Sequence, residues 1–358
     1  MFTTASVWAT PITIAGNTVK QLLVPAGALN VELAADGVHK VFNEYGAWLA
    51  TRGVASEDGP LVACLPTLGD SGRLTWMGSP ALTDPADVLE SYRGAIGFRS
   101  HDEAGSLRRP QIGALHSIVG YRASGVNDPG IVVMPTGTGK TETMLAVLVA
   151  ARPRRVLVIV PTVALREQVA SKFETLGVLQ KFGIVGRDAM RPTVGRLEHG
   201  ISTEEDALRF VQACNIVIAT PNALTTCTHD ARQVILNACT DLMVDEAHHS
   251  AAPTWASIIE AFGGKPTLLF TATPFREDGR SLAGRIIFRF PLREAQKDGY
   301  YTRIDYRAIL SLDDTDQELA QIATERLRSD LGAGYDHILL ARVDSIAAAK
   351  KIAQIYVR

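Results

Sequence analysis

The sequence has few features of secreted, membrane or zinc-binding proteins. It contains four cysteines in 358 residues, and no two of them form a C-x-x-C pair. This scatter argues against a disulfide framework or a zinc ribbon and fits a reducing compartment. The chain has no run of about 20 apolar residues, the length that a membrane-spanning helix needs. Its first residues have neither the basic segment nor the apolar stretch of a secretion signal. We therefore expect a cytoplasmic protein that does not bind a membrane.

The chain also lacks an excess of charge of either sign. Its formal net charge is −2, so no basic excess indicates nucleic-acid binding. Nucleic acid is not excluded, because a protein that holds phosphates with backbone N–H groups and helix N-termini needs few lysines. Hydrophobic residues make up 46% and charged residues 21% of the chain. This composition is typical of a globular protein with a sizeable core, and the length allows two or three domains.

From Gly130 onward, short apolar runs alternate with segments that are long enough for helices. The runs are IVVM (131–134), VLVIV (156–160), IVIA (216–219), DLMV (241–244) and TLLF (267–270). Continuous apolar runs are typical of strands buried on both faces of a parallel sheet. The alternation predicts a doubly wound α/β domain over residues 101–298, with ligands at the carboxyl ends of the strands.

Residues 1–100 do not continue this pattern. They contain Trp8, Trp48 and Trp76 together with turn-rich stretches and short runs of residues that favour strands. We expect an N-terminal accessory domain here, of mixed or β-containing structure, separate from the doubly wound domain.

Residues 299–358 predict the beginning of a second α/β unit. The pattern favours a strand at 301–310, a helix at 316–331, a strand at 337–343 and a helix at 344–358. Two strands and two helices cannot close a sheet whose faces are both covered. The second unit is therefore expected to be incomplete.

The stretch PTGTGKT (135–141) has the composition of a phosphate-binding loop, or P-loop. It follows a predicted strand and precedes a helical pattern, which is the context that this motif requires. Gly137 and Gly139 allow the backbone to turn its N–H groups toward phosphate oxygens, and the helix N-terminus adds a favourable dipole. Lys140 would reach the β- and γ-phosphates of a nucleotide, and Thr141 would hold Mg²⁺.

One residue departs from the usual spacing of this loop. Met134 stands where the G-x-x-x-x-G-K-[ST] pattern has its first glycine. A glycine-rich turn that joins a strand to a helix by chance is the alternative interpretation, and the correct flanking elements argue against it. The expected nucleotide-binding residues of the loop are Thr136, Gly137, Thr138, Gly139, Lys140 and Thr141.

A second motif, LMVDEAHHS (242–250), contains two adjacent acids directly after another predicted strand. Asp245 at the strand end can hold Mg²⁺, and Glu246 can orient or deprotonate an attacking water. With Lys140, these two acids are the expected catalytic residues. Incidental surface acids are the alternative, but a phosphate loop upstream makes that a poor explanation. Adjacent histidines at 248 and 249, outside an H-E-x-x-H frame, are weak evidence for a metal site.

In this order, GTGKT (137–141), DEAH (245–248) and TATP (271–274) resemble the first motor lobe of superfamily 2 helicases and translocases, the DEAD/DEAH-box proteins. The resemblance covers about residues 107–298. It implies a RecA-like fold that binds ATP and Mg²⁺ and hydrolyses ATP to move along nucleic acid, as the lobe closes and opens against a second lobe.

The same resemblance assigns roles to residues outside these motifs. Gln111, in LRRPQIGAL, matches the upstream glutamine that reads adenine. The stretches at 160–169 and 219–224 resemble the turns that contact the nucleic-acid backbone. The residues that would make those contacts are Pro161, Thr162, Thr220 and Pro221.

A further implied role is the link between the nucleotide site and the nucleic-acid groove. Thr271 and Thr273 match the residues that form this link through a partner such as His248. The continuation PFREDG (274–279) resembles restriction-enzyme motor subunits and double-strand DNA translocases. We include its Arg276 among the coupling residues. A charged loop with a local ion pair is the alternative interpretation of this stretch.

We therefore expect an ATP-dependent helicase or translocase that acts on DNA. Two alternatives stay open. The DEAH motif alone would equally suggest an RNA-dependent ATPase. A nucleotide-gated binding module, in which ATP switches a protein partner in a defence or repair complex, is the alternative from another class of function.

In this family, the sixth motif of the second lobe supplies an arginine that reaches the γ-phosphate. No stretch of that kind follows the segment 337–343 before Arg358. Such an arginine contributes roughly 10³–10⁵ in rate in other nucleotide hydrolases, and Arg276 is a poor substitute because it lies on the first lobe. We expect this chain to be part of a longer polypeptide, and to bind ATP but hydrolyse it slowly.

Overall fold

The computed structural model describes residues 2–33, 39–43, 46–50, 62–64, 72–77, 80–97, 105–186, 188–248, 253–275, 281–302, 306, 308–309 and 315–356. The chain divides into two compact units, Met1–Tyr301 and Thr302–Arg358. None of the helices in the described ranges is long and apolar enough to cross a membrane.

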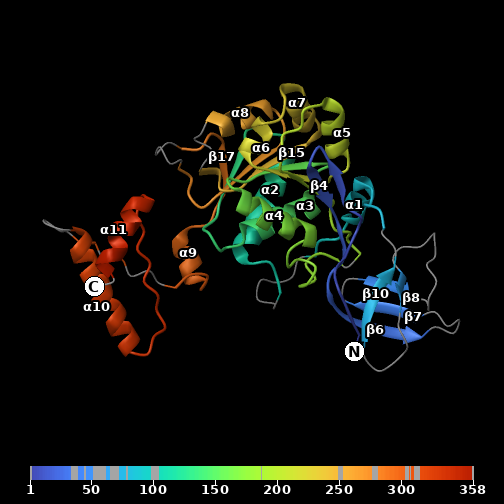
Figure 1. The fold of residues 1–358 in the computed structure, drawn as a ribbon. Coiled ribbons are helices and arrows are strands. Elements are labelled where there is room, and N and C mark those ends of the chain that lie inside the picture. The colour runs from blue at the N-terminus through green and yellow to red at the C-terminus, as the bar shows by residue number, and fades with distance from the viewer. Residues whose placement is uncertain are drawn as a thin grey trace. The chain divides into compact units, whose positions relative to one another are not determined.

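A nine-stranded sheet organises the first unit (Figure 1). Its strand order is β17-β11-β16-β15-β12-β14-β13-β4-β3, and every pair from β17 to β13 is parallel. The parallel strands are β11 (Gly130–Val133), β12 (Val156–Ile159), β13 (Val194–Leu197), β14 (Ile216–Ala219), β15 (Asp241–Val244), β16 (Thr267–Thr271) and β17 (Arg285–Arg289). The five apolar runs that the sequence singled out are all strands of this sheet, so the parallel-sheet prediction is confirmed.

Helices cover both faces of this sheet. One core contains side chains of α1 (Pro85–Ser91), α2 (Arg109–Ala123), α3 (Lys140–Ala151) and α4 (Val163–Thr175). The opposite core contains side chains of α5 (Glu204–Gln212), α6 (Pro221–Thr225), α7 (His229–Ala238) and α8 (Pro253–Ala261). Successive strand residues alternate between the two cores, since Val132 and Val158 face the first while Ile131 and Leu157 face the second. The doubly wound α/β class is therefore confirmed.

Part of the N-terminal region belongs to this sheet. Strands β3 (Ile12–Ile14) and β4 (Asn17–Lys20) form a hairpin, and β4 pairs antiparallel with β13. The Asn17 side-chain oxygen accepts hydrogen bonds from the backbone N–H groups of Glu198 and His199, at 2.6 and 2.8 Å. The hairpin thus extends and covers the β13 edge, which would otherwise expose unpaired backbone groups.

The rest of the N-terminal region forms strands that do not join the central sheet. One six-stranded sheet has the order β8-β7-β6-β1-β10-β9, and a two-stranded ribbon pairs β2 with β5. The strands are β1 (Phe2–Thr4), β2 (Val7–Trp8), β5 (Leu22–Val24), β6 (Gly27–Leu33), β7 (His39–Asn43), β8 (Gly46–Ala50), β9 (Val62–Cys64) and β10 (Gly72–Met77). The β-containing character expected of this region is present.

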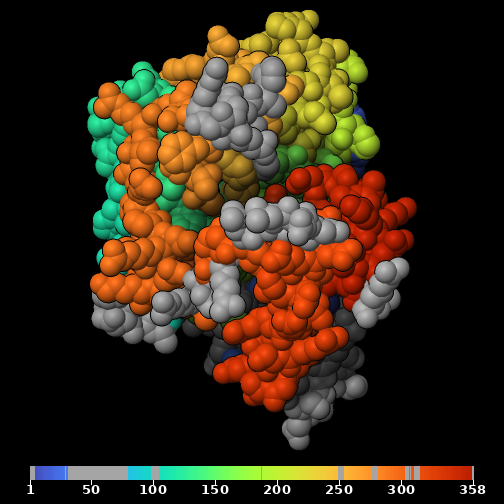
Figure 2. All heavy atoms as spheres, turned by 90° about the vertical axis from the view of Figure 1, so that its left-hand side faces the viewer, coloured from blue at the N-terminus to red at the C-terminus, as the bar shows by residue number. Residues whose placement is uncertain are grey.

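The end of the first unit packs against α2. Strand β17 is followed by α9 (Leu292–Lys297), and Figure 2 shows the orange surface of this segment beside the blue-green surface of α2. Arg109 Nη1 of α2 lies 3.3 Å from Asp298 Oδ1 and 3.7 Å from Glu294 Oε2. These ion pairs tie the start of α2 to the end of α9.

In the second unit, α10 (Thr315–Gly332) and α11 (Ile346–Tyr356) occupy the two stretches in which helices were predicted. The strand predicted at 337–343 is wrong, because these residues have no regular secondary structure. Ile338 and Leu340 are 92% and 91% exposed. A strand needs a hydrogen-bonded neighbour, and the described residues of this unit supply none. The strand predicted at 301–310 lies partly outside the described residues, and the described ones are not in a strand.

Candidate nucleotide-binding site

The predicted phosphate loop lies between β11 and α3. Gly137 and Gly139 have φ angles of 80° and 93°, in the left-handed region that favours glycine. A Cβ atom at Gly139 would collide with the side-chain amide of Gln111. Gly139 is also the N-cap of α3, so the free N–H groups of the first helical turn face the loop. The loop therefore has the geometry of a phosphate cradle.

Two loop residues face the protein rather than the loop's concave side. Met134, which replaces the first glycine of the pattern, is fully buried, and its backbone N–H donates to Thr271 O at 2.9 Å. It is therefore a core residue, and the departure from the pattern leaves the cradle intact. Thr138 is also buried, and its hydroxyl donates to Pro135 O at 2.7 Å. Its side chain fixes the turn of the loop.

The predicted catalytic residues Lys140, Asp245 and Glu246 lie together. Lys140 Nζ is 3.0 Å from Glu246 Oε1, and the Glu246 N–H donates to Asp245 Oδ1 at 3.0 Å. Both acids follow β15, and the Asp245 N–H donates to Ile159 O at 2.9 Å, which fixes the end of β15 against β12. Glu246 has a φ of 50°, a conformation that costs a non-glycine residue about 1 kcal/mol or more.

Burial perturbs the titration of Asp245. Asp245 is 5% exposed. Loss of water raises its pKa above the usual range, the Glu246 carboxylate raises the pKa further, and the Lys140 ammonium opposes both effects. A carboxylate whose charged form is destabilised in this way gains from a nearby cation. Asp245 and the Thr141 hydroxyl are therefore suitable oxygen ligands for Mg²⁺.

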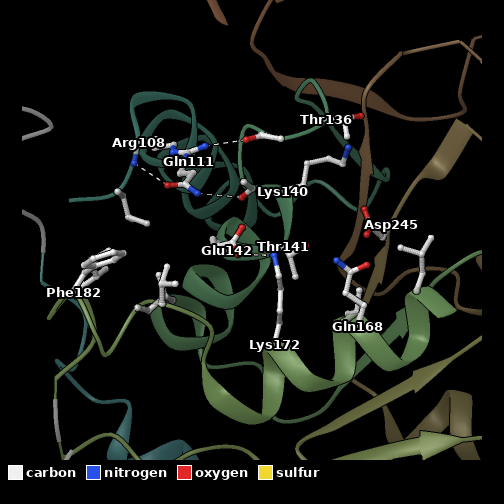
Figure 3. Close-up of a pocket in the computed structure, with 18 of the residues that line it drawn as sticks. Arg108, Gln111, Thr136, Lys140, Thr141, Glu142, Gln168, Lys172, Phe182 and Asp245 are labelled. Carbon is white, nitrogen blue, oxygen red and sulfur yellow. Dashed lines mark hydrogen bonds and ion pairs between the residues drawn. The ribbon is translucent and has the colours of Figure 1, made fainter. Parts of the chain in front are cut away.

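These residues surround one cavity of about 550 Å³ (Figure 3). Its walls come from the segment before α2, the phosphate loop, α3, α4, the α4–β13 connection and the end of β15. The residues that line it are Ser106, Leu107, Arg108, Gln111, Thr136, Gly137, Gly139, Lys140, Thr141, Glu142, Leu165, Gln168, Val169, Lys172, Val178, Leu179, Phe182, Ile184, Asp245 and Glu246. A nucleoside triphosphate fits the size and polarity of this space.

Gln111 lies in the cavity wall, as expected for a residue that contacts the base. Its Oε1 accepts a hydrogen bond from the Arg108 N–H at 2.8 Å, and its Nε2 donates to Gly139 O at 3.3 Å. The amide therefore joins the start of α2 to the phosphate loop, and its second N–H hydrogen stays available to a ligand.

Sequence reasoning missed Arg108. Its Nη1 donates to Gly137 O at 2.9 Å, and its guanidinium lies 5.3 Å from the centroid of the Tyr300 ring. The Tyr300 ring in turn packs against Phe290. Arg108 thus connects the phosphate loop to the last residues of the first unit. The spacing of Arg108 and Gln111, which is that of a helix N-cap and its third residue, is the signal that could have revealed it.

Three of the predicted coupling residues, His248, Thr271 and Thr273, lie in contact. His248 Nδ1 is 3.3 Å from Thr271 Oγ1 and 3.4 Å from Glu246 Oε2. The Thr271 hydroxyl donates to Thr273 O at 2.7 Å and accepts from Thr273 N at 3.2 Å. Since the single hydroxyl hydrogen goes to Thr273, this network favours a hydrogen on His248 Nδ1. Arg276 and the second histidine of the motif lie outside the described residues.

The four predicted nucleic-acid residues lie in two turns that follow neighbouring strands. Pro161 and Thr162 follow β12, Thr220 and Pro221 follow β14, and the two strands pair in parallel. The Thr162 hydroxyl accepts from Leu165 N at 3.2 Å, and that of Thr220 accepts from Ala223 N at 3.3 Å. Both threonines therefore cap helices at the same edge of the sheet that carries the phosphate loop.

Comparison with known proteins finds a family model and two curated relatives that each match part of the chain. The family described as "Type III restriction enzyme, res subunit" matches residues 104–276. The chain is 34% identical over 133 residues to an Arabidopsis thaliana protein named as DEAD-box ATP-dependent RNA helicase 44, covering 33% of this chain and 19% of that protein. It is 28% identical over 170 residues to the DNA 3'-5' translocase XPB2 of Sulfurisphaera tokodaii, covering 46% and 33%. The chain spans a third or less of the length of either relative.

Solved structures are similar to part of the chain. The type ISP restriction-modification enzyme LlaBIII bound to DNA is 17% identical, with a TM-score of 0.42, over 70% of this chain and 21% of that one. The helicase domain of Pyrococcus furiosus Hef is 19% identical, with a TM-score of 0.36, over 63% and 48%. The strand order and the phosphate loop establish the α/β fold independently of these overlaps.

Proposed function

We propose that the chain carries a RecA-like motor lobe like that of superfamily 2 helicases, because the res-subunit family of type III restriction enzymes matches residues 104–276, and that it is part of an ATP-dependent motor on DNA. Residues 101–298 would be the ATP-binding lobe, residues 1–100 an accessory domain and residues 299–358 the start of a second lobe. The matching family supports an ATP-dependent motor on nucleic acid. That the nucleic acid is DNA and not RNA is our proposal.

The residues of the cavity support the binding of ATP with Mg²⁺. The N–H groups at Gly137 and Gly139 and the first turn of α3 would bind phosphate oxygens, and Lys140 would neutralise the β- and γ-phosphates. Thr141 and Asp245 would hold Mg²⁺, which supplies positive charge to the phosphate oxygens. Glu246 would accept a proton from the attacking water.

The observation that carries this proposal is the 3.0 Å ion pair between Lys140 Nζ and Glu246 Oε1. A phosphate that pairs with Lys140 would replace Glu246 as its partner and release the carboxylate for water. Glu246 would then be free as a base only when a nucleotide fills the loop. His248, 3.4 Å from Glu246 Oε2 and 3.3 Å from Thr271 Oγ1, would connect that exchange to the end of β16.

The proposal of DNA as the nucleic acid rests on a resemblance in sequence. One relative is named as an RNA helicase and the other as a DNA translocase, so the family does not choose between them. The stretch PFREDG, which contains Arg276, favours DNA by its resemblance to double-strand DNA translocases. The capped turns at Thr162 and Thr220 would contact the phosphate backbone, which carries no sequence information.

Hydrolysis of Mg²⁺–ATP in the presence of duplex DNA or of RNA tests the proposal. We expect slow hydrolysis that duplex DNA accelerates and that RNA of equal length changes little, with no turnover in the Glu246→Gln chain. Stimulation by RNA alone would identify an RNA-dependent ATPase. ATP binding without stimulation by either nucleic acid would favour the nucleotide-gated protein switch.

A further inference from the structure

The turn of the β3–β4 hairpin, formed by Ala15 and Gly16, takes no part in the nucleotide site. It belongs to the N-terminal region, whereas the matching family covers only residues 104–276. The family therefore assigns this turn no role. Its place in the central sheet nevertheless sets it beside the turns that would contact DNA.

The order of the strands places the hairpin turn in a row with the turns after β12 and β14. Strand β12 pairs with β14, β14 with β13, and β13 with β4. The first three strands are parallel, so the turns that follow them leave from one edge of the sheet. Strand β4 is antiparallel to β13, with Thr18 opposite Arg196, and Figure 1 shows β4 in dark blue beside α5. Ala15 and Gly16 precede β4 and therefore lie beyond the carboxyl end of β13, at that same edge.

Direct contacts hold the hairpin turn against the segment that follows β13. The Asn17 side-chain oxygen accepts hydrogen bonds from the backbone N–H groups of Glu198 and His199. Ala15 and Gly16 have φ angles of 47° and 78°, as a tight two-residue hairpin turn requires. A Cβ atom at Gly16 would lie 3.0 Å from Cδ2 of His199, so the imidazole packs on the turn.

The same segment connects the hairpin turn to α6. A Cβ atom at Gly200 would collide with the backbone carbonyl of Thr226, the C-cap of α6. Helix α6 therefore begins at the Thr220 turn and ends against this segment. The carboxylate of Glu198 lies 3.2 Å from Arg166 Nη2, and this ion pair offsets the repulsion that the acid would exert on a phosphate.

The groups that the hairpin turn exposes are suited to a phosphate backbone. Ala15, Gly16 and His199 are exposed. Small residues allow another backbone to approach closely, and an imidazole N–H can donate to a phosphate oxygen. Three strand spacings separate β12 from β4, which is roughly 14 Å. Phosphates along one strand of a duplex are spaced by about 3.4 Å, so the row of turns has room for about four of them.

We propose, on the premise of the DNA motor described above, that the β3–β4 turn is a further contact to the DNA backbone. The N-terminal hairpin thereby extends the DNA-binding edge of the central sheet beyond the turns after β12 and β14. His199 is the hydrogen-bond donor beside the hairpin turn. Because its partner is the sugar–phosphate backbone, the contact carries no sequence information.

Charge substitutions at Ala15 in the whole chain test this contact. Ala15→Lys should lower the Kd for duplex DNA at least about threefold at about 50 mM salt, and Ala15→Asp should raise it by a similar factor, because the new charge would lie close to a phosphate. Ala15→Lys should also steepen the dependence of the logarithm of the binding constant on the logarithm of salt concentration, by up to about 0.9. Fluorescence anisotropy with two unrelated duplexes of equal length measures both quantities, which should agree between the duplexes.

Ala123→Lys and Ala123→Asp are the matched controls. Ala123 is exposed at the end of α2, and the preceding Arg122 pairs with Asp241, the first residue of β15. Ala123 therefore lies at the opposite edge of the sheet, and its variants should change the Kd less than about twofold, because salt screens distant charges.

The two Ala15 variants also separate a contact from a disturbed fold. Misfolding would weaken DNA binding in both, whereas the contact changes the Kd in opposite directions. Weaker binding by both variants, or effects no larger than those at Ala123, would overturn the hairpin contact and leave the proposed function standing. An unmodified chain that binds no duplex DNA would overturn the proposed function together with this inference.

Discussion

At the scale of single residues, Lys140 and Glu246 hold each other in place through their 3.0 Å ion pair. Lys140→Ala should weaken ATP binding and abolish hydrolysis, because the charge that neutralises the β- and γ-phosphates is lost. Glu246→Gln should keep ATP binding and lose turnover by at least about 100-fold, because it removes only the proton acceptor. Calorimetry and steady-state hydrolysis separate these outcomes.

The matched control is Glu260→Gln, which changes an exposed acid of α8 in the same chemical way. It should hydrolyse ATP at the unmodified rate. Normal hydrolysis by the Glu246→Gln chain would show that another group activates the water.

The raised pKa of Asp245 makes the stability of the folded chain depend on pH. The folded chain binds a proton at Asp245 more tightly than the unfolded chain does. The free energy of unfolding therefore falls as the pH rises from the ordinary aspartate pKa of about 3.9 through the raised value. Asp245→Asn should raise the free energy of unfolding at pH 7 without Mg²⁺, and the difference should vanish at low pH.

Urea denaturation at several pH values measures this effect. Asp188→Asn, at an exposed acid of the α4–β13 connection, is the control and should change stability little. An Asp245→Asn chain that is less stable than the unmodified chain at pH 7 would show that the charged carboxylate is stabilised by its neighbours despite its burial.

At the scale of elements, the turns after β12 and β14 combine helix capping with a proposed contact to nucleic acid. Thr162→Ala removes the cap of α4 and should cost about 1 kcal/mol of stability. If the turn also contacts the backbone, DNA binding should weaken to a similar extent for every sequence. Fluorescence anisotropy with two unrelated duplexes measures this.

Thr203 provides the matched control for that experiment. Its hydroxyl caps α5 by accepting from Asp206 N at 3.2 Å, and it lies in neither predicted turn. Thr203→Ala should therefore lose similar stability and keep its affinity for DNA. If both substitutions weaken DNA binding equally, Thr162 only caps α4 and does not contact DNA.

The elements show how far local sequence determines this fold. The five apolar runs could be predicted as strands because each is almost continuously apolar, which is the pattern of a strand buried on both faces. Strand β13 was missed because its sequence contains Gly195 and Arg196, which weaken an apolar pattern. The structure buries Arg196 through an ion pair with Glu174, 2.8 Å from its Nη2. That partner lies on α4, and spacing along the chain does not reveal such a long-range pair.

In the site, too, features set by neighbouring residues could be predicted and features set by long-range packing could not. The phosphate loop and the two acids were predicted because each motif carries its chemistry within a few residues. Arg108 and Phe182 were missed, because their positions at the cavity depend on the packing of α2 and of the α4–β13 connection. The strand predicted at 337–343 failed for a related reason, since an apolar run becomes a strand only beside a partner.

At the scale of the whole molecule, the first unit joins two N-terminal strands to the central parallel sheet. The β3–β4 hairpin could not be assigned to that sheet from composition, because its pairing with β13 spans some 170 residues of sequence. The net charge of −2 likewise does not tell where basic side chains gather on the surface.

DNA binding by the whole chain should nevertheless depend on salt. If backbone phosphates are the contacts, the logarithm of the binding constant should fall linearly with the logarithm of salt concentration, with the same slope for unrelated sequences. Titrations between about 50 and 200 mM salt measure the slope. A sharp sequence preference with little salt dependence would instead favour a protein switch.

If this lobe couples ATP to nucleic acid, the binding of one ligand must change the affinity for the other. Two ligands that are coupled change each other's affinity by the same factor. The measurement is the Kd of the Glu246→Gln chain for duplex DNA, with and without saturating Mg²⁺–ATP, beside the Lys140→Ala chain as control. We expect ATP to change the Kd for DNA at least about fivefold in the Glu246→Gln chain and to leave it unchanged in the Lys140→Ala chain. A Kd for DNA that is the same with and without ATP in the Glu246→Gln chain would show that the lobe does not couple the two ligands.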